Sequence, residues 1–227
     1  MDNTNTKIVP SLHDRFAAWV LDHRRGFLAV VTILLITVVA WGAYQVWQGQ
    51  QDNQKLDKIY AFQSKNMKAW EEGTITAQDL AAAFQDLRQE VGPFVGLYPF
   101  ALALSDELLS KGATNEVATI LEDAMKNYVK GNNYRRYLVA TRLAAAYEDL
   151  GQTQKAIDVL QSLDAAHTKL LPDKVKLDLG RLYRTIDPAK AKTYLQAVVE
   201  NSQVAEFSRI AKLYLQTLEG AVPSAQK

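Results

Sequence analysis

The stretch RLAAAYEDLGQTQKAIDVLQSL, residues 142–163, decides the fold of this chain. Its apolar residues recur at intervals of three and four on both sides of Gly151, a pattern that predicts two amphipathic helices. Glycine suits the turn between them because it adopts left-handed backbone conformations without steric cost. Small residues such as Ala144 and Ala156 let the two helices approach closely. The stretch therefore predicts a pair of helices joined by a tight turn.

The same layout recurs along the chain on both sides of this stretch. One large aliphatic residue occupies the equivalent place in each successive first helix: Leu104, Leu143, Leu179 and Ile210. Their separations are 39, 36 and 31 residues. Helix pairs that repeat at about 34 residues are typical of helical solenoids, in which each pair buries its apolar face against its neighbours. We therefore expect an all-α fold whose main part is a helical solenoid.

Turn and cap residues predict where the helices begin and end. Thr76 with Asp79 is a capping pattern for a helix that closes at Val91-Gly92-Pro93, after an earlier helix that ends at Gly73. A break is expected near Gly49 in that earlier helix. Three further helix pairs are expected. Their first helices span residues 98–112, 134–151 and 173–186, and their second helices begin at Thr114, at Thr153 and at Asp187-Pro188. A last helix is expected at residues 202–219, with Ser202 as its cap.

An uncharged run, GFLAVVTILLITVVAWGAYQVW, occupies residues 26–47. As a helix it would be about 33 Å long, which matches the roughly 30 Å hydrocarbon core of a bilayer. A buried core helix and a cleaved signal peptide are the alternatives. Both are usually shorter, and the bulky residues Trp41, Tyr44 and Trp47 disfavour cleavage while suiting the headgroup region. The run therefore predicts a retained transmembrane helix.

The flanking charges predict the orientation of this helix. Arg24 and Arg25 abut its start, whereas the first basic residues beyond its end are Lys55 and Lys58. The positive-inside tendency places residues 1–25 in the cytoplasm and the chain from residue 48 outside. Residues 12–23 have helical apolar spacing, which fits either an amphipathic helix at the inner membrane face or an extension of the span.

Composition excludes several classes of function. The part after residue 47 carries 22 basic and 22 acidic residues, a balance that argues against nucleic acid as a partner. The chain has no cysteine and hence no disulfide framework or thiolate chemistry. The three histidines, His13, His23 and His167, have no metal-ligand neighbours at helical spacing, and no phosphate-binding loop occurs. We expect no enzyme activity, cofactor, metal or small-molecule substrate.

Residues 142–163 resemble the tetratricopeptide repeat. The repeat's Leu, small, Tyr, Gly, Ala and large apolar positions are matched in order by Leu143, Ala144, Tyr147, Gly151, Ala156 and Leu160. The following pair keeps five of these features, at Leu179, Gly180, Tyr183, Ala191 and Leu195, but has Asp187-Pro188 where the turn glycine would be. The preceding pair is a degenerate copy, and residues 206–219 look like a capping half-repeat.

With its apolar run, orientation and repeats, the whole chain resembles the YfgM-like family of ancillary subunits of the bacterial SecYEG translocon. The resemblance implies a cytoplasmic segment at residues 1–25, a transmembrane helix at 26–47, a helical connector with the first helix pair at 48–96, tetratricopeptide-like repeats with a capping helix at 97–219, and a mobile tail at 220–227. It implies a single-pass inner-membrane protein with a periplasmic repeat domain. The implied function is a non-enzymatic scaffold that binds the translocon and a PpiD-like periplasmic chaperone and assists proteins leaving the channel.

In tetratricopeptide solenoids the first helix of each pair lines the concave face, where partners bind. The candidate partner-binding residues are Leu102, Asp106, Leu109, Leu138, Thr141, Ala145, Glu148, Leu177, Arg181 and Arg184. Many peptide-binding members clamp a terminal carboxylate with Lys and Asn, but Thr141 and Ala145 stand at those places, so the clamp is absent. Leucines mixed with charges suggest a broad surface for another chain. Ordinary packing or solvation explains any single position equally well.

Two other functions fit the same sequence. The chain could be an assembly factor for another envelope complex, such as cytochrome maturation or cell division, built on the same anchor and repeats. It could also be a structural partner that self-associates through its solenoid. The apolar run has no pair of glycines four residues apart, so it offers no sequence support for dimerisation within the membrane.

Overall fold

The structure is a computed structural model that describes the backbone of residues 24–165 and 170–220, and the side chains of residues 34–165 and 170–218. The chain divides into two units, Met1–Gln54 and Lys55–Lys227. Helix α2, Arg24–Phe62, runs through the boundary between them. The amphipathic helix predicted within residues 12–23 and the tail from residue 221 lie outside the described residues.

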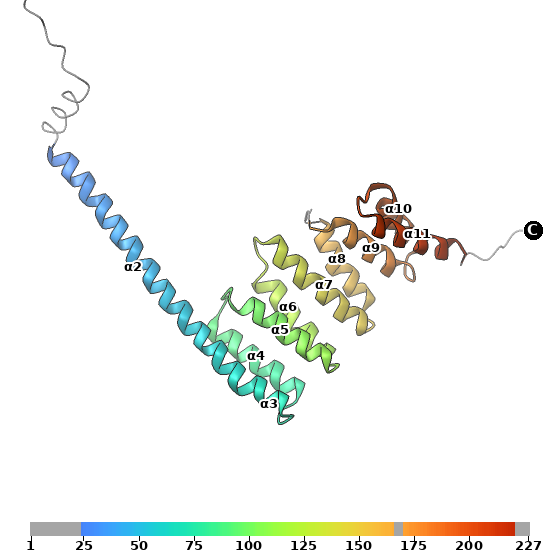
Figure 1. Ribbon diagram of the computed structural model, residues 1–227, viewed down its shortest axis with the longest axis horizontal. Helices are drawn as coiled ribbons and strands as arrows, with labels where there is room; N and C mark the ends of the chain where they lie inside the picture. The colour runs from blue at the N-terminus through green and yellow to red at the C-terminus, as the bar shows by residue number, and fades with distance from the viewer. Residues whose placement is uncertain (1–23, 166–169, 221–227) are drawn as a thin grey trace, which may run out of the picture. The chain divides into compact units, whose positions relative to one another are not determined.

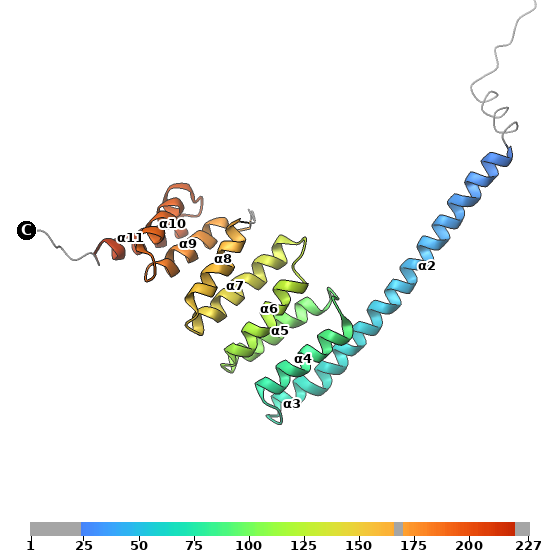
Figure 2. The ribbon, with the colours of Figure 1, turned by 180° about the vertical axis from the view of Figure 1, so that it is seen from behind.

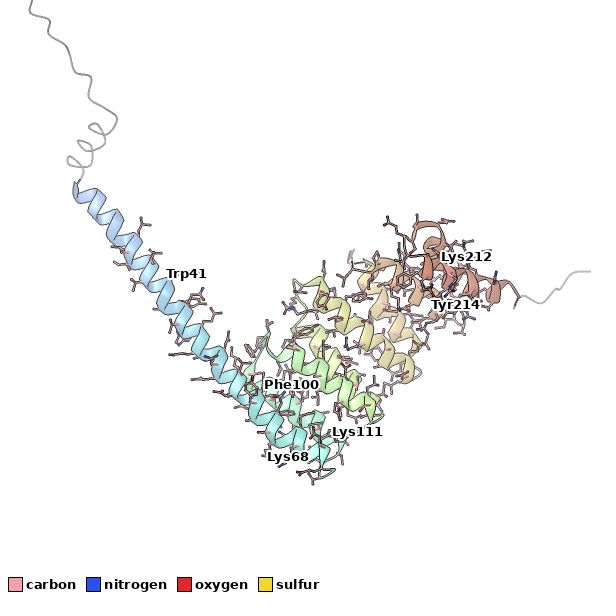
Figure 3. The ribbon with its side chains drawn as sticks, in the orientation of Figure 1. Trp41, Lys68, Phe100, Lys111, Lys212 and Tyr214 are labelled. Carbon is pink, nitrogen blue, oxygen red and sulfur yellow. The ribbon has the colours of Figure 1, made fainter. Side chains whose placement is uncertain are left out.

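In the first unit, all described side chains of α2 except the half-buried Asp52 are solvent-exposed. Leu34, Val39 and Trp41 each keep 60% or more of their surface exposed, and Trp41 projects from the helix in Figure 3. Helix α2 continues through Gly49, so the predicted break there is wrong. In the part of the chain that the structure describes, no helix combines the length and apolarity needed to cross a membrane. Residues 26–33 of the predicted span lie before the first described side chain.

The second unit is built from successive helices, and every regular element described in it is helical (Figure 1). The end of α2 continues as a π-helical turn and a short helix before the first reversal of the chain. The elements are η1 (Gln63–Met67), α3 (Lys68–Glu71), α4 (Ala77–Val91), α5 (Leu97–Ser110), α6 (Thr114–Asn127), α7 (Asn133–Asp149), α8 (Thr153–Ala165), α9 (Pro172–Tyr183), α10 (Pro188–Asn201) and α11 (Ala205–Gly220).

The helices of this unit pack in chain order. From α5 onward each helix packs against the next, and α4 also contacts α6 while α9 contacts α11. Figures 1 and 2 show this succession of helix pairs from both sides. The predicted all-α fold of this unit is confirmed in the residues that the structure describes. Contacts between consecutive helices are also what a repeat architecture requires.

Side-chain caps fix several of the helix ends. Thr76 Oγ1 accepts a hydrogen bond from the Asp79 backbone N–H at 3.1 Å, and the Asp79 carboxylate accepts one from the Thr76 N–H at 3.0 Å. These bonds with Thr76 lower the pKa of Asp79. Asp187 likewise accepts from the Lys190 N–H at 3.1 Å, with Pro188 in the first turn of α10. Both predicted helix starts are therefore confirmed.

The start of α11 differs from the prediction. Ser202 ends α10 as its C-cap, and its hydroxyl accepts a hydrogen bond from the Val204 backbone N–H at 3.2 Å. The helix itself begins at Ala205. The short Ser202 side chain bonds to the turn that separates the two helices, so it caps that turn and not the start of α11.

One main hydrophobic core joins the helix pairs. At its N-terminal end the rings of Phe62, Phe84 and Phe100 meet, with the Phe62 and Phe100 centroids 5.5 Å apart in an edge-on arrangement. Phe100 is labelled in Figure 3. A smaller core beneath α11 contains Leu177, Leu195, Val198 and Ala211. Each end of the array thus has its own set of buried apolar side chains.

Helices α9 and α10 approach each other closely at Gly180. A Cβ atom added there would lie 2.7 Å from Cγ of Leu195, which is fully buried. Glycine suits this position because any side chain would force the buried Leu195 side chain, or one of the two helices, to shift. The small residue that the repeat pattern predicts at Gly180 therefore has a direct structural reason.

Candidate functional site

A groove of about 340 Å³ opens between α7 and α9. Helix α7 contributes five of its lining residues, α9 four, and α8 one from below. The lining residues are Tyr137, Thr141, Ala144, Ala145, Glu148, Leu160, Lys174, Asp178, Arg181 and Leu182. Its volume lies at the lower end of the range for ligand pockets, which is enough for a few side chains of a partner.

The floor of the groove is apolar. Ala144, Leu160 and Leu182 are buried, and Ala145 above them is exposed. Thr141 adds no free donor, because its hydroxyl donates to the Tyr137 carbonyl of its own helix at 2.8 Å. The floor therefore favours apolar groups over polar ones.

The charged side chains of the groove are bonded to one another. Arg181 forms a two-pronged pair with Glu148, in which Nη2 donates to Oε2 at 2.7 Å and Nη1 donates to Oε1. Lys174 Nζ donates to both carboxylate oxygens of Asp178, with 2.7 Å to Oδ1. The two pairs bring two positive and two negative charges to the lining, so the groove carries no net charge.

These contacts also change the acidity of the side chains involved. The hydrogen bonds from Arg181 lower the pKa of Glu148, and the same contact raises the pKa of Arg181. Burial, followed by the nearby charge of Asp178, raises the pKa of Tyr137. Glu148 and Arg181 are therefore both ionised, and Tyr137 is neutral, across the physiological pH range.

Ion pairs connect successive first helices along the array. Arg142 Nε of α7 donates to Asp106 Oδ1 of α5 at 3.1 Å, just as Arg181 of α9 pairs with Glu148 of α7. The partners are 36 and 33 residues apart, about one repeat in each case. Both pairs place the carboxylate on the earlier helix and the arginine on the later one. In both pairs, therefore, a carboxylate on the first helix of one repeat binds an arginine on the first helix of the next repeat.

Four of the ten predicted positions come together in the groove between α7 and α9. They are Thr141, Ala145, Glu148 and Arg181. Asp106 is exposed and pairs with Arg142, at the step before this groove. The Arg184 guanidinium lies 4.8 Å from the centre of the Tyr214 ring of α11, at the step after it (Tyr214 is labelled in Figure 3).

The four predicted leucines lie in different surroundings. Leu102 is half-buried against the main core, Leu138 is half-buried, and Leu109 is exposed near the end of α5. Leu177 is only 5% exposed, so the prediction that it lies on an open groove surface is wrong. Helix α11 packs against α9 and closes Leu177 into the small core with Leu195 and Ala211.

Six lining residues were not predicted. Ala144 and Leu160 belong to the repeat pattern of apolar and small positions that was assigned to packing, whereas Tyr137 belongs neither to that pattern nor to the predicted binding positions. Lys174 and Asp178 are four residues apart with opposite charges and precede Arg181 on the same helix, a spacing that could have placed them on its exposed face. Leu182 carries no signal beyond its helical spacing.

Within the described ranges, no three His, Cys, Asp or Glu side chains lie close enough together to hold a metal ion. His13, His23 and His167 fall outside those ranges. What the groove can do is accept apolar groups of a partner between two bonded charge pairs. Neither family models, nor characterised proteins, nor solved structures give a match to this chain.

Proposed function

We propose that this protein is a non-enzymatic scaffold, anchored in the bacterial inner membrane, that binds the SecYEG translocon and a PpiD-like periplasmic chaperone. In this role it assists proteins as they leave the channel. The observation that carries the proposal is the groove between α7 and α9, in which four predicted partner-binding residues meet over an apolar floor. The array of helix pairs supports a tetratricopeptide-like solenoid, and such solenoids bind other polypeptides.

Residues 26–47 are the proposed membrane anchor. The run has no charged residue, and α2 is helical from Arg24 onward. Its described side chains, such as Leu35 and Val39, are exposed apolar groups, which would be unfavourable in water and favourable in lipid. Arg24 and Arg25 support a cytoplasmic N-terminus, which would place the repeats in the periplasm.

The groove is proposed to hold an extended or partly folded polypeptide. Glu148 with Arg181, and Lys174 with Asp178, already satisfy each other's charge. A strongly charged ligand would have to break one of these pairs, whereas an apolar side chain can enter between them. This favours segments with exposed apolar residues, which are common in proteins that have just left a translocation channel.

Site-specific photocrosslinking in intact membranes tests the proposal. A benzoylphenylalanine residue would replace Trp47 beside the proposed anchor, Ala145 in the groove, or Thr193 on the exposed face of α10 as the matched control. We expect translocon subunits to be captured at position 47, and the chaperone or unfolded envelope proteins at position 145, with little capture at position 193.

Two results would contradict the proposal. Capture of a different envelope machine at positions 47 and 145, without translocon subunits, would assign the protein to the assembly of that machine. Equal capture at positions 145 and 193 would show that the groove is not a binding surface.

A further inference from the structure

A second groove, of about 450 Å³, lies on the first helix pair of the second unit. The end of α2 with η1 forms one wall, and α4 forms the other. The lining residues are Lys58, Ala61, Phe62, Lys65, Asn66, Ala83, Asp86, Leu87 and Glu90. All of them belong to this one helix pair, at the end of the array opposite to α11. The groove between α7 and α9 shares none of these residues.

The floor of this end groove permits close approach of another helix. Phe62 and Leu87 are each 5% exposed and close the bottom. Ala61 is exposed and Ala83 is half-buried, one from each wall. Alanine keeps these helix surfaces free of bulky side chains, so the helices of another molecule can approach both walls closely without steric conflict.

The two walls carry opposite charges. Lys58 and Lys65 line the wall formed by α2 and η1, and Asp86 and Glu90 line the wall formed by α4. Lys58 Nζ lies 2.9 Å from Glu90 Oε1 and so bridges the walls at one level. Within the residues that the structure describes, Lys65 and Asp86 form no ion pair. The end groove thus presents an unused positive charge on one side and an unused negative charge on the other.

The π-helical turn lies in the wall that carries the unused positive charge. Lys65 and Asn66 both belong to η1, Gln63–Met67. A π turn replaces the usual hydrogen-bond spacing with a wider one, and such turns are frequent at functional sites. Here the turn carries two of the residues that line this wall.

We propose that the end groove is a self-association surface through which two copies of this chain pair about a two-fold axis parallel to α2. Rotation about such an axis lays α2 of each copy over α4 of the other, at the same level along the helices. The basic wall of one copy then faces the acidic wall of its partner, and the contact occurs twice by symmetry. A second copy supplies both complementary walls at once.

The levels of the charges fit this arrangement. Lys58 of α2 and Glu90 of α4 lie at about the same height along the helix axes, since they form an ion pair. At about 1.5 Å per residue, Lys65 lies roughly 10 Å and Asp86 roughly 6 Å farther along in the same direction. A lysine side chain spans the remaining difference of a few ångströms. Lys65 of one copy therefore meets Asp86 of the other, while the two Lys58–Glu90 pairs form a cluster of alternating charge.

Charge reversal in the full-length chain tests the pairing, with sedimentation equilibrium in detergent as the readout. The wild type should form dimers. Lys65→Glu alone and Asp86→Lys alone should each raise the dimer dissociation constant by roughly tenfold or more, because each creates two like-charge contacts. Mixing the two single variants in equal amounts should restore dimers, since every contact in the mixed dimer again joins opposite charges.

Cysteine crosslinking locates the contact, because the chain has no cysteine of its own. Ala61→Cys should give a covalent dimer with a short bismaleimide, whereas Thr193→Cys on α10 should not. A wild type that stays monomeric at every concentration would overturn the proposal. So would a mixture of the two charge variants that dissociates as readily as either alone, or crosslinking in membranes that joins position 61 only to a different protein.

Discussion

At the scale of single residues, the contact between Gly180 and Leu195 gives a direct test of the packing of α9 on α10. Gly180→Ala would place a methyl group 2.7 Å from Leu195 Cγ, so the buried Leu195 side chain or one of the two helices must shift. We expect a loss of about 1 to 3 kcal/mol in the free energy of unfolding, measured by urea denaturation. Gly49→Ala is the matched control, since nothing lies within 4 Å of the added atom and alanine favours a helix. Equal stability of both variants would contradict the close approach.

The ion pair between Glu148 and Arg181 predicts a pH-dependent contribution to stability. Because the pKa of Glu148 is lowered in the folded state, its contribution is complete above the ordinary value of 4.5 and is lost as the pH falls below it. Both side chains are about one-third exposed, so Glu148→Gln should cost about 0.5 to 1 kcal/mol at pH 7. The difference from wild type should shrink in acid. Glu200→Gln, at an exposed site on α10, should show no such trend.

The residues of the α7–α9 groove show what the sequence could predict at this scale. Thr141, Ala145, Glu148 and Arg181 were predicted because they hold fixed places relative to the turn of each helix pair. The pairing of Glu148 with Arg181, and of Asp106 with Arg142, was not predicted. Each pair joins residues one repeat apart, and their distance depends on how one helix pair is stacked on the next. Helical periodicity within a pair does not specify that stacking.

At the scale of whole helices, α11 packs against α9 and α10 and buries the small core at the C-terminal end of the array. Ala211 is fully buried with Leu177 and Leu195, so Ala211→Asp would place an unpaired charge in the small core. We expect faster hydrogen exchange in α11 and α10, with α4 and α6 unchanged, because stability in repeat arrays is carried by neighbouring contacts. Lys212→Asp, at the adjacent exposed position, should leave exchange unchanged. Uniform acceleration in all helices would contradict this local role.

Helix ends were predictable where a side chain bonds to the backbone of its own turn. Thr76, Asp79 and Asp187 bond within three residues along the chain, so the pattern is visible in the sequence. The position of α11 over α9 was not predictable in the same way. The helical spacing of Leu177 predicts a position on the exposed face of α9. It is buried because α11, some thirty residues later in the chain, packs against that face.

At the scale of the whole molecule, the proposed anchor can be tested by membrane extraction. If residues 26–47 are the anchor, the full chain should remain in the membrane pellet after alkaline carbonate treatment, because this run has no charged residue. A variant lacking residues 1–47 should appear in the soluble fraction. Deletion of residues 221–227 is the matched control and should leave the protein in the pellet. Release of the full chain by carbonate would contradict a membrane span.

The order of the helix pairs was predictable because their apolar spacing and turn residues are local features of the chain. The division of the chain is less evident from the sequence. The uncharged run ends at Trp47, yet the second unit begins at Lys55, and α2 continues through both places. Backbone hydrogen bonds extend a helix wherever no residue interrupts them, so a change in composition does not end the element.

The packing of each helix mainly against its neighbours also determines how the second unit would respond to mechanical tension. When the two ends of such an array are pulled apart, the load falls on one interface after another. Each interface opens at a modest force, and the pairs that remain closed keep their structure. An array of this kind is expected to lengthen in several small steps, whereas a domain whose stabilising contacts join distant parts of the chain unfolds in one step. We therefore expect the second unit to extend gradually under tension applied at its two ends.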